Sequence, residues 1–136
     1  MRLHQLKSLK VTKLEAAGHA ISAWIMDDEA KDAEGMMFLT DKEVKSNEGM
    51  IFLFPIIQTA DKGFWMHNTL IPLDIVYIGK NKRVVSISHG KVQDDTPLYP
   101  AGPYFYVVEL KAGTAKKLGI KAGTTFKIPA DLKALD

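Results

Sequence analysis

Apolar and polar residues alternate with a period of two along much of the chain, the pattern of β-strands buried on one face. In the first clear example, Ile21, Ala23 and Ile25 share one face. By contrast, 50–54 is apolar on both faces, which is typical of a central strand, and we expect Pro55 to end it. The pattern predicts seven short strands, at 9–14, 21–26, 50–54, 73–78, 83–88, 104–110 and 124–128.

Two short segments between these strands are predicted to be helical. Asp27 and Asp28 can cap a helix at 29–34, and Gly35 can end it. A second helix is expected at 114–118. Together these elements predict an α+β, mainly β fold, either a curved antiparallel sheet or a partial barrel. The 136 residues fit one domain, with a core at about 9–128 and flexible ends.

Composition narrows the classes of function. Eighteen Lys and Arg against sixteen Asp and Glu leave a net charge of +2, which argues against a dedicated nucleic-acid binder. The absence of cysteine excludes disulfides, thiolate nucleophiles and Cys-ligated metals. The longest apolar run has eight residues, too few to span a membrane. The compartment stays open, because a processed exported form would have the same sequence as a cytoplasmic one.

Several catalytic motifs are missing. The chain has no phosphate-binding loop, no dinucleotide-binding glycine motif, no Gly-x-Ser-x-Gly elbow and no His-Glu-x-x-His zinc motif. The four histidines are scattered without the spacing of metal ligands. We therefore expect neither a metal site nor a cofactor.

Two carboxylates fall on otherwise apolar strand faces. Asp74 shares a predicted face with Val76 and Ile78, and Glu109 shares one with Val107. A buried carboxylate needs donors. Asp74 could therefore bind backbone N–H groups of the Asn68–Thr69 loop and fix that loop in place. Alternatively, its pKa could be raised for acid–base chemistry, and adjacent strands could pair it with Glu109.

Residues 63–74 concentrate polar and aromatic side chains among apolar neighbours. Trp65, Asn68 and Thr69 could line a ligand groove, together with Tyr99 from a proline-rich loop at 90–103. Aromatic residues on strands are more often part of a core, so this reading competes with a purely structural one.

Five motifs follow one another in a characteristic order: GMMF at 35–38, EGMIF at 48–52, FWMHNT at 64–69, IPLDI at 71–75 and VEL at 108–110. Their order and spacing resemble domain-of-unknown-function family 192, small proteins of bacteria and archaea, over about residues 9–128. The resemblance implies a compact β-rich domain with few short helices and no assigned reaction. Many relatives begin with an export signal or a lipid-attachment segment, which this chain does not show.

Positions that recur in this family are matched here by Gly35, Met37, Gly49, Met50, Trp65, Met66, Asn68, Thr69, Leu73, Asp74 and Glu109. Two positions depart from the family. Leu39 stands where the family usually has Arg, and His67 stands where Lys is common. If that Arg holds an anionic ligand in the relatives, the role is lost or moved in this chain.

Two functional hypotheses follow from the sequence. The first is a non-enzymatic binding or accessory module, whose ligand would be a small molecule, a glycan or a peptide. The second is a hydrolase or lyase using Asp74, with Glu109 or His67 as proton partner. A role of the 65–74 block in the fold alone is a third reading.

Overall fold

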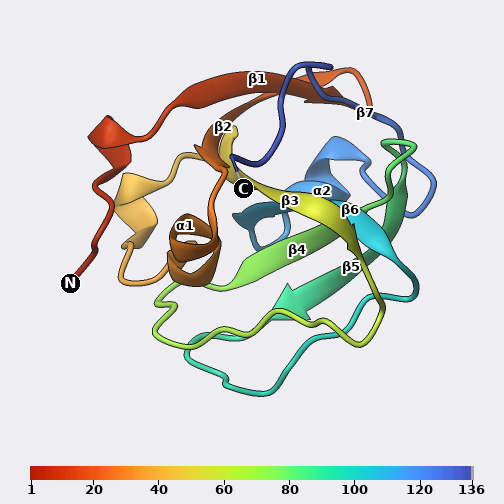
Figure 1. Cartoon of the computed structure of the whole chain (residues 1–136). Coiled ribbons are helices and arrows are strands. Elements are labelled where there is room, and N and C mark those ends of the chain that lie inside the picture. Colours follow the sequence, from red (N-terminus) through yellow and green to blue (C-terminus); the bar gives the residue numbers. More distant parts are fainter. Residues whose placement is uncertain (136) are drawn as a thin grey trace.

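A single sheet organises the computed structural model, which describes residues 1–135 (Figure 1). Its seven strands within these residues are β1 (Val11–Ala16), β2 (His19–Met26), β3 (Glu48–Gln58), β4 (Leu73–Ile78), β5 (Val84–Gly90), β6 (Tyr104–Lys111) and β7 (Phe126–Lys127). Two short α-helices, α1 (Glu29–Glu34) and α2 (Thr114–Leu118), accompany it, with 3₁₀ turns at Leu6–Ser8 and Asp41–Glu43. None of the helices described in 1–135 has the length and apolar character needed to cross a membrane. The predicted mainly β fold, with about seven strands and two short helices, is confirmed.

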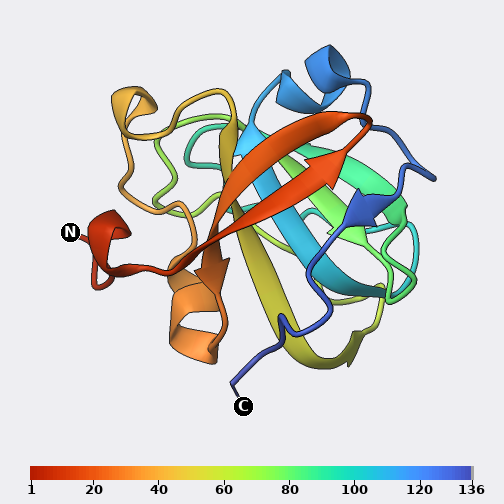
Figure 2. The ribbon, with the colours of Figure 1, turned by 90° about the horizontal axis from the view of Figure 1, so that it is seen from above.

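The sheet curves into a half-barrel, with the strand order β5-β4-β6-β3-β2-β1-β7 (Figure 2). The turn between β4 and β5 reaches β7 at the far edge of the sheet. There the N–H of Phe126 donates to the carbonyl of Lys82 at 2.8 Å, and the N–H of Val84 donates to the carbonyl of Thr124 at the same distance. These bonds join the two edges of the curved sheet.

The connection from β2 to β3 places α1 over the sheet. All neighbouring strands are antiparallel except β2 and β3, which are parallel. A parallel pair needs a crossover connection, and here the crossover contains α1. The Asp28 side chain caps the helix by accepting from the N–H of Lys31 at 2.8 Å.

Two hydrophobic cores lie on the two faces of the sheet. The inner core, inside the half-barrel, contains Val76 and Val108, and α2 packs against it through Ala115. The outer core, on the face that α1 covers, contains Ile75 and Val107. We call these the inner and outer faces of the sheet. The period-two pattern predicted this division for β4 and for most of β6.

Several strand ends differ from the expectation, and the differences in β3 and β7 have a structural cause. The prediction that Pro55 ends its strand is wrong, because β3 continues to Gln58. The pairing of β3 with β6 shifts register between Leu53 and Gln58, so Pro55 stands at an irregularity where no ladder N–H is needed. The last strand is shorter than predicted and comprises two residues, because Thr124 and Thr125 contact the β5 side instead.

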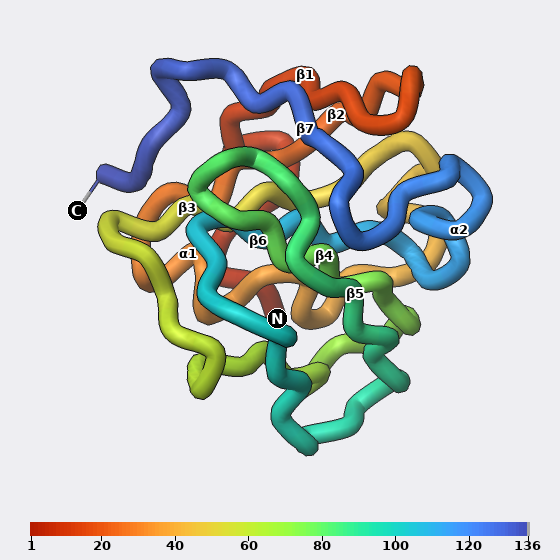
Figure 3. The backbone as a smooth tube through the Cα atoms, turned by 90° about the vertical axis from the view of Figure 1, so that its right-hand side faces the viewer, coloured from red at the N-terminus to blue at the C-terminus, as the bar shows by residue number. Residues whose placement is uncertain are grey.

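Two long loops, at 59–72 and 91–103, run side by side at one end of the molecule (Figures 1 and 3). Phe64 and Leu98 exchange two backbone hydrogen bonds, at 3.1 and 2.7 Å. The N–H of Met66 donates to Asp94, and the carbonyl of Thr69 accepts from Gln93. The proline-rich loop thereby holds the Phe64–Thr69 segment in place beside the outer core.

Candidate functional site

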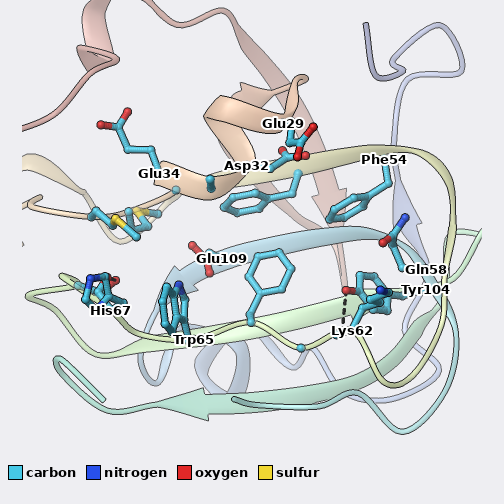
Figure 4. A pocket seen from close by; sticks show the side chains of 18 of the residues that line it. Glu29, Asp32, Glu34, Phe54, Gln58, Lys62, Trp65, His67, Tyr104 and Glu109 are labelled. Atoms are coloured by element: carbon cyan, nitrogen blue, oxygen red, sulfur yellow. Dashed lines mark hydrogen bonds between the residues drawn. The ribbon is translucent and has the colours of Figure 1, made fainter. Parts of the chain in front are cut away.

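A groove of about 670 Å³ lies between α1 and the outer face of the sheet (Figure 4). One wall is formed by α1 and the residues that follow it. The opposite wall is the 62–67 segment, and strands β3 and β6 form the floor. The groove therefore exists because the β2–β3 crossover and the paired long loops lie on the same face of the sheet.

Aromatic rings make up much of its surface. Phe52 and Phe64 meet edge to face with centroids 5.2 Å apart, and Phe54 contacts Tyr104 in the same way at 5.6 Å. The Tyr104 hydroxyl donates to the carbonyl of Lys62 at 2.8 Å, and burial raises the pKa of this hydroxyl to about 12. These contacts fix the rings in place without a ligand.

Trp65 stands in the wall of the groove and is 49% exposed. Its ring stacks on the imidazole of His67, with centroids 4.6 Å apart and an interplanar angle of 25°. The Nδ1 atom of His67 lies 2.9 Å from a carboxylate oxygen of Asp95. The indole is thus held from one side by this short stack, while half of its surface is open to solvent.

Glu109 projects from β6 into the middle of the groove, beneath α1 (Figure 4). Its side chain is buried, with 4% exposure, yet it makes no hydrogen bond or ion pair with any other residue in 1–135. Burial raises the pKa of the Glu109 carboxyl to about 8. At neutral pH this group is therefore mostly protonated, and no other residue in 1–135 forms a hydrogen bond with it.

Three further acidic residues, all from α1, line the groove. Glu29 and Asp32 face it, whereas the Glu34 side chain points away from Glu109 (Figure 4). Glu34 accepts from the N–H groups of Leu3 and His4, the latter at 2.9 Å. Burial alone would raise the pKa of Glu34, but these donors outweigh it and hold the value below the usual range. Glu34 thus fixes the N-terminal segment to α1, and Glu29 and Asp32 supply the acidic rim.

Gly35 allows the chain after α1 to close over Glu109. Its φ of +49° lies in the region that L side chains rarely adopt. A Cβ here would lie 3.2 Å from Cζ of Phe52 and 3.6 Å from Oε1 of Glu109. The wall can approach the floor this closely because the residue has no side chain.

Asp74 lies on the other face of the sheet. It is 1% exposed; its Oδ2 accepts from the N–H of Ala115 in α2, and its Oδ1 lies 3.0 Å from Nδ1 of His89. The expectation that the Asn68–Thr69 loop supplies its donors is therefore wrong. β4 and β6 are neighbours, but Ile75 stands opposite Glu109, and Asp74 stands opposite Leu110. The two carboxylates consequently point to opposite faces and do not form a pair.

The sequence comparison places the chain in a family. The model of domain-of-unknown-function family 192 (DUF192), described as an uncharacterised ACR, matches residues 11–128. This chain belongs to DUF192. No curated protein matches it.

Two solved structures resemble this DUF192 chain. A protein of unknown function from Novosphingobium aromaticivorans DSM 12444 is 36% identical, with a TM-score of 0.81 and coverage of 93% of this chain and 91% of that one. A protein from Sinorhizobium meliloti 1021, described as a proposed transcription regulator, also has a TM-score of 0.81. It is 24% identical over 88% of this chain and 94% of its own, so it shows the shared fold alone.

The DUF192 groove includes some of the residues that the sequence singled out. Trp65, His67, Thr69 and Glu109 line it. The Thr69 hydroxyl donates to the carbonyl of His67 at 3.1 Å and is buried. Asn68 and Tyr99 are not among the lining residues.

These two residues have other surroundings. Asn68 has a φ of +53°, and its carbonyl accepts from the N–H of Phe38 at 2.9 Å, so it shapes the loop. Tyr99 is 57% exposed and lies next to Gly63. Its ring is therefore at the surface beside the groove.

Other lining residues were not foreseen. Glu29 and Asp32 looked like ordinary exposed residues of an acidic helix, and Phe52 looked like a strand residue. Only the parallel β2–β3 pairing, which the period of two does not reveal, places α1 above β6.

Leu39 and His67, the two residues that depart from the DUF192 pattern, have different surroundings. Leu39 is buried in the outer core, whereas His67 lines the groove. No group of three or more His, Asp or Glu side chains within 1–135 is arranged to hold a metal ion.

Proposed function

We propose that this DUF192 domain is a non-enzymatic binding module that holds a small molecule in the groove. The observation that carries the proposal is Trp65, a half-exposed indole in the wall of a largely apolar groove whose aromatic rings are already fixed. Binding sites for small molecules are typically concave, mostly apolar and largely formed before the ligand arrives. A volume of about 670 Å³ falls in the usual range for such sites.

The placement of the carboxylates favours binding over the acid–base alternative. That alternative requires Asp74 to exchange protons with Glu109 or His67 at hydrogen-bonding distance. Asp74 is instead on the inner face, where the N–H of Ala115 and the ring of His89 occupy its two oxygens. Glu109 and His67 line the groove on the outer face, without Asp74.

A thermal-shift screen tests the proposal. The screen uses a library of amines, carboxylic acids, monosaccharides, disaccharides and short peptides, because a ligand of the folded state raises the midpoint of unfolding. We expect hits for the natural sequence, and at least a tenfold loss of affinity for Trp65→Ala, since aromatic anchors commonly dominate binding. Tyr99→Ala is the matched control, because it removes an exposed aromatic ring that does not line the groove.

Two results would contradict the proposal. One is the absence of any compound that raises the midpoint across the whole library. The other is a set of hits whose affinities change equally in Trp65→Ala and Tyr99→Ala, since binding would then lie outside the groove. Circular dichroism of both variants checks that each is folded.

A further inference from the structure

We propose that the ligand of this groove is an organic cation, an ammonium group on an apolar body, and that Glu109 binds the ammonium. This inference rests on the proposed binding function and adds the class of ligand. It is carried by a buried carboxyl group that points into the groove and has no partner among residues 1–135.

The Glu109 carboxyl has no hydrogen-bond partner among residues 1–135. Polar groups that are largely buried usually have a hydrogen-bond partner in the protein. The Glu109 oxygens are not among the fully enclosed unpaired atoms of residues 1–135, so the carboxyl opens to the groove, where a ligand can reach it. Asp74 and Glu34, the other buried carboxylates discussed above, each have at least two hydrogen-bond contacts. A carboxylate only accepts hydrogen bonds, whereas an ammonium group only donates them, so the two are complementary. A bound ammonium would supply Glu109 with the partner that the fold leaves out.

The charged side chains that line the groove are mostly acidic. Glu29 and Asp32 face the groove from α1, and Lys62 is the sole Lys or Arg in its lining. Lys62 is exposed, and its carbonyl accepts from the Tyr104 hydroxyl at the far end of the groove from His67 (Figure 4). A cation would be attracted by this rim, and an anion would be repelled.

Aromatic rings that can attract a cation also line the groove. A cation within about 6 Å of a ring centroid is attracted to the face of the ring, most strongly for Trp. Trp65 stands in the groove wall near Glu109 (Figure 4), and Phe52 and Phe64 also line the groove. The aromatic rings and the Glu109 carboxyl together form a site that suits an ammonium group attached to an apolar chain or ring.

Binding of an ammonium group to Glu109 should release a proton, which makes the affinity depend on pH. Since the Glu109 carboxyl keeps its proton up to a pKa of about 8, an ammonium must displace that proton to solvent when it binds. Affinity should therefore rise by about tenfold per pH unit from pH 6 to pH 8 and then level off. A neutral ligand that accepts a hydrogen bond from protonated Glu109 would instead show a constant affinity below the pKa and a falling affinity above pH 8.

Other titratable groups face Glu109 or line the groove. They are Glu29, Asp32 and Glu34 on the α1 side, Lys62 and His67 in the loop wall, Tyr77 on β4 and Tyr104 on β6. Burial raises the pKa of both tyrosines, so they stay neutral over this range. His67 is the one imidazole in the groove lining, so the variant His67→Asn must be measured alongside.

The test is isothermal titration calorimetry with 4-phenylbutylamine, 4-phenylbutanol and 4-phenylbutyrate, which differ only in the terminal group. We expect the amine to bind at least tenfold more tightly than the alcohol or the acid at pH 8. Its affinity should rise with pH in the natural sequence and in His67→Asn. In Glu109→Gln the amine should bind at least tenfold more weakly at pH 8, with no dependence on pH. Glu29→Gln, on the exposed rim, should weaken the amine about twofold at low salt.

Three outcomes would overturn the inference. Equal binding of the alcohol and the amine, or an amine affinity that falls as pH rises, would exclude the cation while leaving a groove that binds ligands. Failure of all three probes would also exclude it. The proposed function then stands if the library screen finds Trp65-dependent ligands of another class, and it fails if the screen finds none.

Discussion

Asp74 and Glu109 lie at adjacent register positions of neighbouring strands, and both are more than nine-tenths buried. Asp74, on the inner face, has contacts at both oxygens, from the backbone of α2 and from His89. Glu109, on the outer face, makes no hydrogen bond or ion pair with any residue in 1–135. The comparison teaches that burial alone does not distinguish a structural carboxylate from a functional one. What distinguishes them is whether the fold itself supplies the donors.

The largest expected effect of this difference is on the pH dependence of stability. Glu109 ionises near pH 4.5 when the chain is unfolded but near pH 8 when it is folded. The unfolded state therefore binds fewer protons in this interval, and the free energy of unfolding falls as pH rises from 4.5 to 8. The contribution of this one group is at most about 5 kcal/mol.

Urea denaturation at pH 5 and pH 8 measures the effect against Glu109→Gln. The amide resembles the protonated acid, so the variant and the natural sequence should be similarly stable at pH 5. At pH 8 the variant should be the more stable one. If the two proteins show parallel pH profiles, Glu109 is ionised or partnered in the folded state, and its contrast with Asp74 disappears. The carboxyl groups with lowered pKa values, such as Glu34, act below this interval and do not obscure it.

The second prediction concerns Asp74→Asn, which replaces the buried carboxyl group on the inner face with an amide. Asp74→Asn weakens a charge-assisted hydrogen bond to the N–H of Ala115 in the buried first turn of α2. We expect the free energy of unfolding to fall by about 2 kcal/mol, the usual size for hydrogen bonds to charged groups. The urea midpoint at pH 7 measures it, with Asp131→Asn, an exposed carboxylate, as the control for charge.

A loss no greater than that of Asp131→Asn would contradict a structural role for Asp74. Amine affinity provides a second contrast between the two sites. It should be unchanged in Asp74→Asn, because this side chain lies on the face opposite to the groove.

The sequence alone predicts on which face of its strand each of the two carboxylates lies. Alternation with a period of two places Asp74 on a face with Val76 and Glu109 on a face with Val107, and the structure confirms both. The pattern fails at the start of β6, because a period of two would place Tyr104 on the same face as Val108, whereas Tyr104 is in the outer core. There the pairing with β3 is irregular, and local periodicity carries no information about such a register shift.

The groove itself could not be predicted, because it depends on which strands are neighbours. The parallel pairing of β2 with β3 brings Glu29 over Glu109, and these residues are eighty positions apart in the sequence. Similarly, the donor of Asp74 is in α2, forty-one positions away, rather than in the nearby 68–69 loop. Residue types indicated that both carboxylates needed partners, but only the tertiary fold decides which of them receives one.

The smallest expected effect concerns His89, the second partner of Asp74. Its side chain is 78% exposed, so water can replace the imidazole at Oδ1 when His89→Ala is made. The N–H of Ala115 still binds Oδ2, and we expect a loss of about 0.5 kcal/mol, as for exposed ion pairs. A double-mutant cycle with Asp74→Asn, followed by urea denaturation at pH 7, measures the coupling directly. A loss for His89→Ala as large as that for Asp74→Asn would mean that an exposed side chain, rather than the buried backbone of α2, stabilises this carboxylate. The distinction between a carboxylate that the fold satisfies and one that it leaves for a ligand would then have to be drawn from side-chain partners at the surface.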